Sequence, residues 1–165
     1  LMATSQAGPT QPITADHMAQ ALSGLKGKPR ADRAVMVAAV VEAAKRHKVD
    51  ALWLLAVAYV ESRHNRTLRG DKGRSRGPFQ LGMGAARTVR PKVKAAELHR
   101  WPTAADIAAR YWARLFKRYG VKVAPVIYNC GPVRCRQSDG TQRKETPATR
   151  AYWRAYRAMK GKVSK

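Results

Sequence analysis

One segment, the ten uncharged residues Ala51–Val60, constrains the fold more than any other part of the sequence. In a chain in which 26% of the residues are charged, this run is apolar on every side of a helix, and a helix of that kind is buried. Asp50 comes directly before it and is a favourable N-cap. Glu61 follows the run, and residues 63–77 are then polar and rich in glycine. We therefore expect a domain built around one buried helix that ends in a carboxylic acid.

Two helices are predicted upstream of the buried one. Thr14 is the expected N-cap of the first helix, which Gly24 ends. Residues 1–13 are polar and rich in Gly, Pro, Gln and Thr, which is typical of a disordered lead-in, so we expect a single domain over residues 14–165. The second helix is expected over residues 31–47. Its inward-facing stripe would consist of Val37, Val40, Val41 and Ala44.

Two further helices are predicted downstream. Thr103 and Asp106 resemble a capping pair at the start of one helix, which Gly120 ends. Thr146 is the expected N-cap of the last helix, with Pro147 at its first position. No strand signal of useful length is present, and the polar segment after the buried helix is typical of a loop with at most a short hairpin. The sequence therefore predicts a mainly α-helical domain with little or no strand.

The charge balance narrows the class of partner. The chain holds 33 Lys and Arg against 10 Asp and Glu, a net charge of +23, and most of the excess lies after residue 50. Solubility alone explains this poorly, because mixed signs would serve it as well. The excess indicates an anionic partner: a nucleic acid, an acidic membrane surface or a cell-wall polymer. Acidic metal ligands are scarce and the four histidines are scattered, so we expect no metal and no cofactor.

No transmembrane segment is expected. The longest uncharged apolar run is half of the roughly 20 residues that a membrane-spanning helix needs, and no secretory signal peptide opens the sequence. Cys130 and Cys135 are too few for a disulfide framework, and their spacing is not that of a zinc site. A local disulfide, which an oxidising compartment would allow, and two free thiols are equally compatible with this spacing.

Glu61 is the most informative single residue. Two effects are expected to raise its pKa, because apolar surroundings disfavour the charged form and the negative end of the helix dipole does the same. A carboxylic acid that is still protonated near neutral pH is what a general acid requires. On this pattern alone, a surface glutamate paired with an arginine such as Arg63 is an equal alternative.

Three short motifs favour the catalytic interpretation. They are Glu61-Ser62, Gly77-Pro78-Phe79-Gln80-Leu81 and Tyr128-Asn129-Cys130-Gly131. In this order they resemble the catalytic segments of soluble lytic transglycosylases and goose-type lysozymes. That family cuts the β-1,4 bond between N-acetylmuramic acid and N-acetylglucosamine in peptidoglycan. The ordered set is more specific than any one motif and spans roughly half of the chain. The resemblance implies a lysozyme-like fold with Glu61 as the catalytic acid.

The resemblance also implies which side chains bind the substrate. Gln80 and Tyr128 match the active-site glutamine and tyrosine of the family, and an amide offers both a donor and an acceptor to a sugar. Phe79 is expected in the core rather than beneath a sugar ring, since phenylalanine is usually buried, but it remains a candidate. The candidate substrate-binding residues are Ser62, Ser75, Phe79, Gln80, Tyr128 and Asn129.

The number of participating acids decides between two reactions. Many glycosidases use a second carboxylate, and Asp71 is the only acid in the loop after Glu61. Its segment resembles the goose-type lysozyme loop in which an aspartate positions water, although Gly82 stands where that group has a second aspartate. Transglycosylases of the family use one acid, assisted by the substrate's N-acetyl group and its 6-hydroxyl. We expect a lytic transglycosylase with Glu61 as the single acid/base, with a muramidase that uses Asp71 as the alternative.

Peptidoglycan, the predicted substrate, is consistent with the positive net charge of the chain. Peptidoglycan carries carboxylates and many walls add phosphate polymers, so a basic surface would concentrate the protein on a wall. We expect action outside the cytoplasm, as a phage lysin or virion-associated enzyme, or as a periplasmic or secreted one. The expected wall contacts are Arg134, Arg136, Arg143, Lys144, Arg150, Arg154 and Arg157.

Two rival classes remain open at this stage. A basic, helical nucleic-acid-binding protein would explain the charge but gives no role to an uncharged helix that ends in Glu-Ser. A membrane-active C-terminal helix is disfavoured, because the face formed by Tyr152, Ala155 and Met159 is only modestly hydrophobic. His64 is expected to be a solvated loop residue.

Overall fold

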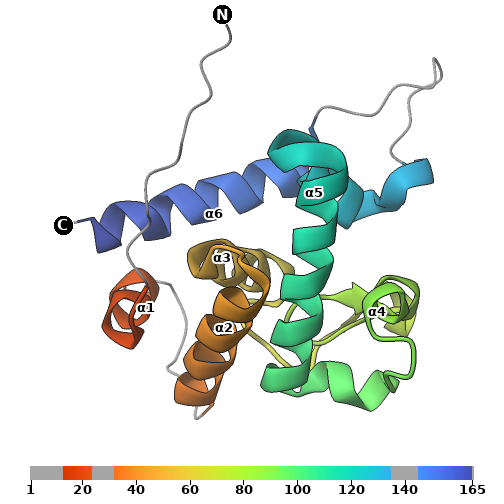
Figure 1. Ribbon diagram of the computed structural model, residues 1–165, viewed down its shortest axis with the longest axis horizontal. Helices are drawn as coiled ribbons and strands as arrows, with labels where there is room; N and C mark the ends of the chain where they lie inside the picture. Colours follow the sequence, from red (N-terminus) through yellow and green to blue (C-terminus); the bar gives the residue numbers. More distant parts are fainter. Residues whose placement is uncertain (1–12, 24–31, 135–144, 165) are drawn as a thin grey trace, which may run out of the picture.

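The structure, a computed structural model, describes residues 13–23, 32–134 and 145–164. Within them the protein is mainly helical, as the sequence predicts, and it also contains one small sheet (Figure 1). The α-helices are α1 (Ala15–Leu22), α2 (Arg33–His47), α3 (Ala51–Ser62), α4 (Met83–Val89), α5 (Trp101–Arg134) and α6 (Pro147–Val163). The strands are β1 (Arg69–Gly70), β2 (Ser75–Arg76) and β3 (Leu81–Gly82), and the short 3-10 helices are η1 (Asp71–Gly73) and η2 (Ala95–His99).

The predicted central helix is α3. Its N-cap is Asp50, whose carboxylate accepts a hydrogen bond of 2.8 Å from the backbone N–H of Leu52. Residues 51–58 are all buried, and Figure 1 places α3 in the middle of the molecule, where α2, α5 and α6 pack around it. Burial of each Leu- or Val-sized side chain contributes about 1.5–3 kcal/mol. The helix is therefore fixed on all sides, and so is the position of Glu61 in its last turn.

Two further predicted helix caps are confirmed, and one is wrong. The hydroxyls of Thr14 and Thr146 each accept a hydrogen bond from the backbone N–H three residues later, at 3.3 and 3.2 Å. Thr103 lies inside α5, which already begins at Trp101. The helix begins earlier because Pro102 occupies its first turn, where the missing N–H of a proline costs no hydrogen bond.

α2 begins two residues later than predicted, and only half of its expected inward-facing stripe is fully buried. α1 ends at Leu22 with Ser23 as its C-cap, and α2 begins at Arg33. Val37 and Val41, which were expected to face inward, are only partly buried. The reason is that α2 packs against both α3 and α5, and the face between these two helices is the one buried. Its fully buried side chains are those of Met36, Val40, Ala43 and Ala44.

α5 is interrupted at two glycines rather than ending at the first. Gly120 and Gly131 have φ angles of 72° and 75° and break the regular helix, and such positive angles favour glycine. The apolar stretch after Gly120, residues 121–128, resumes the helix in a new direction (Figure 1). This change of direction brings Tyr128 and Asn129 to the pocket that Glu61 lines.

The predicted polar loop contains a three-stranded antiparallel sheet in the order β1-β2-β3. Gly70 pairs with Ser75, and Ser75 pairs with Gly82. Each strand has two residues, so the expectation of little strand and a short hairpin is confirmed. Since side chains alternate between the two faces of a strand, Ser75 points to the pocket while its neighbour Arg76 points to the other face.

Candidate active site

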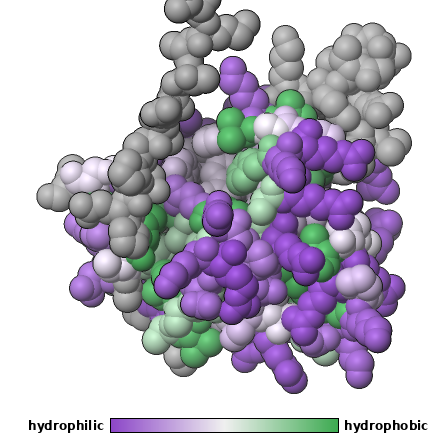
Figure 2. Space-filling view, viewed as in Figure 1, coloured by the Kyte–Doolittle hydropathy of each residue, from purple (hydrophilic) through white to green (hydrophobic). Residues whose placement is uncertain are grey.

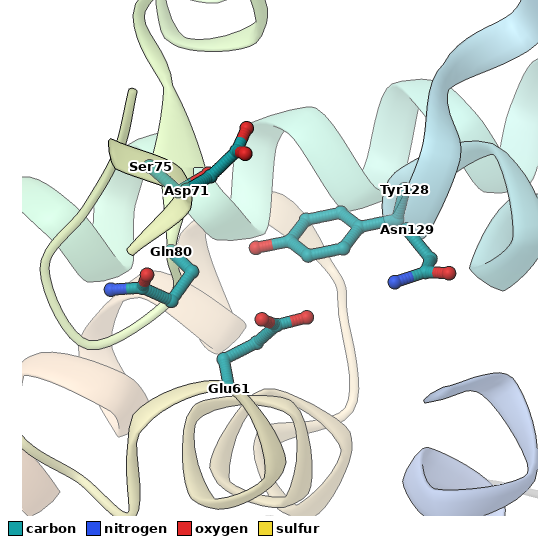
Figure 3. A pocket seen from close by; sticks show the side chains of 6 residues that line it. All are labelled: Glu61, Asp71, Ser75, Gln80, Tyr128 and Asn129. Carbon is teal, nitrogen blue, oxygen red and sulfur yellow. The ribbon is translucent and has the colours of Figure 1, made fainter. Parts of the chain in front are cut away.

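Glu61 lies in the last turn of α3 and faces a pocket of about 300 Å³ (Figure 3). Its side chain is partly buried, and burial raises its pKa from 4.5 to about 7, because poorly solvated surroundings disfavour the charged form. Its carboxyl group therefore exchanges a proton near neutral pH. Arg63, the alternative partner, instead places its guanidinium 4.3 Å from the centre of the Tyr59 ring.

The acid has one direct partner that the sequence reasoning assigned only to the core. This partner is Tyr152, a buried residue of α6, and its Oη donates a hydrogen bond to Oε1 of Glu61. The hydrogen bond favours the ionised carboxylate and lowers the pKa of Glu61, against the larger effect of burial. Burial, together with the nearby carboxylate, raises the pKa of the Tyr152 hydroxyl. The tyrosine therefore stays protonated and remains a donor in both states of the acid.

The ring of Tyr152 is held by aromatic neighbours from two other helices. Trp53 of α3 and Trp112 of α5 meet it edge-on, with ring centroids 6.3 and 6.4 Å away. The start of α6 is tied to α5, since Oγ1 of Thr146 donates a hydrogen bond of 3.1 Å to Oδ1 of Asn129. Packing therefore fixes the hydroxyl that reaches Glu61.

Tyr128 joins the two walls of the pocket. Its ring stacks on Trp112 with centroids 4.4 Å apart, and its hydroxyl donates a hydrogen bond of 2.6 Å to the carbonyl oxygen of Phe79. Burial raises the pKa of this hydroxyl, so it remains a neutral donor. Figure 3 shows Tyr128 reaching across the pocket toward Gln80, with Asn129 beside it. The tyrosine thereby links α5 to the segment that follows the hairpin.

Gln80 lines the opposite wall of the pocket, and the backbone holds its side chain. Its Nε2 donates hydrogen bonds to the carbonyl oxygens of Leu68 and Gly77, at 3.2 and 2.8 Å. Its Oε1 occupies the space that a side chain at residue 70 would fill, because a Cβ on Gly70 would lie 2.2 Å from that oxygen. Glycine at position 70 is thus required for the observed orientation of the amide.

The structure brings together four of the six candidate substrate-binding residues and separates two. Ser75, Gln80, Tyr128 and Asn129 line the pocket with Glu61. Phe79 is fully buried, as the core interpretation predicts, and meets Trp101 edge-on at 6.1 Å. Ser62 is buried too, and its hydroxyl donates a hydrogen bond of 2.8 Å to the carbonyl oxygen of Pro78. These two residues support the walls of the pocket and do not line it.

The expectation that His64 is a solvated loop residue is wrong. The residue has a φ of 61° directly after the end of α3, which turns its side chain back beneath the helix. There Nε2 lies 3.0 Å from the carbonyl oxygen of Leu55, and the side chain is buried. His64 therefore supports the end of the helix that carries Glu61.

Asp71 lines the pocket from the tip of the hairpin. In Figure 3 its carboxylate points away from Glu61. Oδ1 of Asp71 accepts a hydrogen bond of 2.9 Å from Nη2 of Arg74. The one other acid of the pocket is thus engaged by a neighbouring cation.

Several predictions outside the pocket can also be compared with the structure. Cys130 is disulfide-bonded, while Cys135 lies outside the described residues. Tyr152 and Met159 are buried, and α6 packs on α1 and α3, so its apolar face serves the core, as expected. Among the described residues, no helix is both long and apolar enough to cross a bilayer, and no group of three or more metal-ligating side chains occurs.

The surface is strongly hydrophilic. Figure 2 shows hydrophilic side chains over much of the face that α2 and α5 form. Helix α6, which contains no Asp or Glu, adds exposed basic side chains. Of the predicted wall contacts, those that the structure describes are all exposed, namely Arg134, Arg150, Arg154 and Arg157. Arg136, Arg143 and Lys144 lie outside the described residues.

A buried helix ending in a shielded acid, next to a small sheet and a polar pocket, defines a lysozyme-like domain. One solved structure with this fold is an inactive glutamate-to-glutamine mutant of the lytic transglycosylase Slt from Pseudomonas aeruginosa. The TM-score is 0.54 at 19% sequence identity, and the match covers 76% of this chain and 22% of that chain. This chain therefore spans about a fifth of the length of that protein.

The sequence comparison identifies the family. Residues 38–150 match the Transglycosylase SLT domain, and the chain belongs to this family. The resemblance drawn from the three motifs is thus confirmed. No curated protein matches the chain at a significant level. The matched segment contains Glu61 and Tyr128 but ends two residues before Tyr152.

Proposed function

We propose that the protein is a lytic transglycosylase that cleaves the β-1,4 bond between N-acetylmuramic acid and N-acetylglucosamine in peptidoglycan. The observation that carries this proposal is the shielded carboxyl group of Glu61, which has a pKa of about 7 and faces a polar pocket. Membership of the Transglycosylase SLT family supports it. The inactivity of the Pseudomonas Slt glutamate-to-glutamine mutant agrees with catalysis through a glutamate.

In the proposed first step, protonated Glu61 donates its proton to the glycosidic oxygen. The bond from C1 to that oxygen breaks while the acetamido oxygen of the same sugar bonds to C1. In the second step the 6-hydroxyl oxygen attacks C1, the bond from C1 to the acetamido oxygen breaks, and the Glu61 carboxylate takes the proton of the 6-hydroxyl. The product is an anhydro sugar, and no water is consumed. A pKa near 7 suits a group that must both give and take a proton, and Tyr152 stabilises the carboxylate between the two steps.

The other pocket residues are proposed to bind the sugars. Ser75, Gln80 and Asn129 offer hydroxyl and amide groups that match the hydroxyl and acetamido groups of the glycan. The excess of basic residues would hold the protein on anionic wall polymers, and contact with nucleic acid would then be non-specific. This substrate places the site of action outside the cytoplasm, and the chemistry requires neither a metal nor a cofactor.

Digestion of purified sacculi, followed by mass spectrometry of the products, tests the proposal. The wild-type protein should release anhydro-muropeptides. Glu61→Gln keeps the shape of the side chain but has no proton to donate, so we expect cleavage to fall by about 10²- to 10⁴-fold with the fold unchanged by circular dichroism.

Glu42→Gln is the matched control, because Glu42 is an exposed residue of α2 whose carboxylate pairs with Arg46. It should leave cleavage unchanged. Full activity in Glu61→Gln would refute the assignment of the acid. A salt-dependent DNA mobility shift by the wild-type protein, without any digestion of sacculi, would favour the nucleic-acid-binding class instead.

A further inference from the structure

The tip of the hairpin holds the second acid of the pocket in a fixed arrangement. Asp71 is bonded to Arg74 through both its side chain and its backbone. Nη2 of Arg74 donates to Oδ1 of Asp71 at 2.9 Å, and Nε donates to the backbone oxygen of Asp71 at 3.2 Å. The backbone N–H of Arg74 donates to the same oxygen at 3.1 Å. One arginine therefore fixes the whole aspartate residue.

The backbone of the tip supports this arrangement. Asp71 and Lys72 have φ angles of 50° and 55°, which are uncommon for residues other than glycine. These angles form the tight turn η1 between β1 and β2 and return the chain so that Arg74 lies against Asp71. In Figure 3 the carboxylate of Asp71 points away from Glu61.

This geometry bears on the choice between two acceptors for the cleaved sugar. A second carboxylate in a glycosidase pocket acts as nucleophile or as the base that activates water. A base for water must lie within hydrogen-bond reach of that water. The Asp71 carboxylate points away from the acid and has one oxygen bonded to a guanidinium, so it is not placed to take a proton from water at the reacting carbon.

We propose that Arg74 is a positioning residue that keeps Asp71 out of the reaction and so directs the cleaved sugar to its own 6-hydroxyl instead of water. This inference rests on the proposed function. In both courses the leaving sugar has already taken the proton of Glu61. Attack by the 6-hydroxyl forms the C1–O6 bond, breaks the bond from C1 to the acetamido oxygen, and gives the proton of the 6-hydroxyl to Glu61. Attack by water breaks the same bond, forms a C1–OH bond, gives the water's other proton to a carboxylate, and yields a product one water heavier.

The test is the ratio of hydrolysed to anhydro products from purified sacculi. Arg74→Gln releases Asp71, and we expect the hydrolysed share to rise at least threefold. The double variant Arg74→Gln/Asp71→Asn should return to the wild-type ratio, because the released group can no longer act as a base. Lys72→Gln is the matched control at the same tip: it removes the same charge from a side chain that makes no ion pair with Asp71, and it should not change the ratio.

The ion pair is exposed, with 54% and 64% of the Asp71 and Arg74 side chains accessible, so these substitutions should have little effect on folding. An unchanged ratio in Arg74→Gln, or a raised hydrolysed share that persists in the double variant, overturns the inference. So does a fall in hydrolysed product in Asp71→Asn alone, which would mean that Asp71 already acts. A wild-type protein that yields only hydrolysed muropeptides overturns it while leaving glycan cleavage intact. Absence of any cleavage contradicts the proposed function itself.

Discussion

At the scale of single residues, two opposing effects set the proton affinity of Glu61. Burial raises its pKa, and the hydrogen bond from Tyr152 lowers it, with burial the larger effect. The balance leaves the group near pH 7, where either protonation state is accessible. A carboxyl group in water would be almost fully ionised there, and it would be a poor proton donor.

Removal of the tyrosine hydroxyl should shift this balance in a known direction. In Tyr152→Phe the carboxylate loses a donor that favours its charged form, so the pKa of Glu61 should rise above about 7. Because the first step needs the protonated acid, the alkaline limb of the pH–activity profile should move to higher pH. We expect kcat to fall about tenfold, the equivalent of one hydrogen bond to a charged group.

Tyr156→Phe is the matched control for this prediction. It removes a hydroxyl from the same helix, where Oη donates a hydrogen bond of 2.7 Å to Oδ2 of Asp50, the N-cap of α3. It should lower the melting temperature and leave the pH profile in place. Superimposable profiles for Tyr152→Phe and the wild type would show that the hydroxyl does not influence the acid.

The residues of the pocket differ in how far sequence reasoning could identify them. Glu61, Gln80 and Tyr128 lie in short motifs, so a local pattern is enough to find them. Tyr152 contacts Glu61 from 91 residues away, and its spacing within α6 indicates only that it faces inward. No local signal separates a core tyrosine from one whose hydroxyl reaches an acid.

At the scale of secondary structure elements, the hairpin depends on close backbone packing at one glycine. A Cβ on Gly77 would lie 1.9 Å from the carbonyl oxygen of Leu98 in η2, and its φ is +74°. Gly73 has a similar φ of +82°, but a Cβ there would meet nothing within 4 Å. A side chain at position 73 would therefore cause backbone strain alone, whereas a side chain at position 77 would cause both backbone strain and steric overlap.

Gly77→Ala should destabilise the protein much more than Gly73→Ala. A positive φ alone costs an L-residue about 1–2 kcal/mol, which is the loss expected for Gly73→Ala. Gly77→Ala must also push η2 away, and we expect a total of about 2–4 kcal/mol together with lost activity, because Gln80 follows closely. Urea unfolding of both variants measures the difference. Equal losses would contradict the role assigned to the contact with η2.

Five of the six described α-helices were predictable, while α4, the ends of the helices and the small sheet were less so. An uninterrupted apolar run identifies α3 and apolar periodicity identifies α6, each with a capping residue before its first turn, because these signals are local. Gly120 was expected to end a helix, and the regular geometry does break there, but a local signal cannot show that the helix resumes. A strand of two residues is too short to show an alternating pattern in the sequence. The pairing of these strands depends instead on the hairpin and on contacts with η2.

At the scale of the whole molecule, the described acids are largely used for internal contacts. Asp106 bonds to Arg46 and His47, and Asp32 bonds to Trp101 and Arg66. With a net charge of +23, most basic side chains therefore have no acid to pair with. Their charge is available to an anionic surface, which is why the composition predicts an anionic partner.

Salt should weaken binding to the wall more than it weakens the cleavage step. Raising the salt concentration from about 0.1 M to about 1 M shortens the Debye length from about 10 Å to about 3 Å. We expect co-sedimentation with sacculi to weaken at least tenfold over this range. Cleavage of a short glycan without peptides serves as the control and should change much less. Binding that is insensitive to salt would remove electrostatics as the cause of attachment.

The acid of the central helix is completed by the last helix of the fold, since Glu61 belongs to α3 and its hydroxyl partner belongs to α6. During synthesis, a growing chain carries the acid long before the ribosome has released Tyr152. The hydroxyl therefore reaches the acid only after α6 has been synthesised and has docked, and a product truncated before α6 would carry Glu61 without this hydrogen bond.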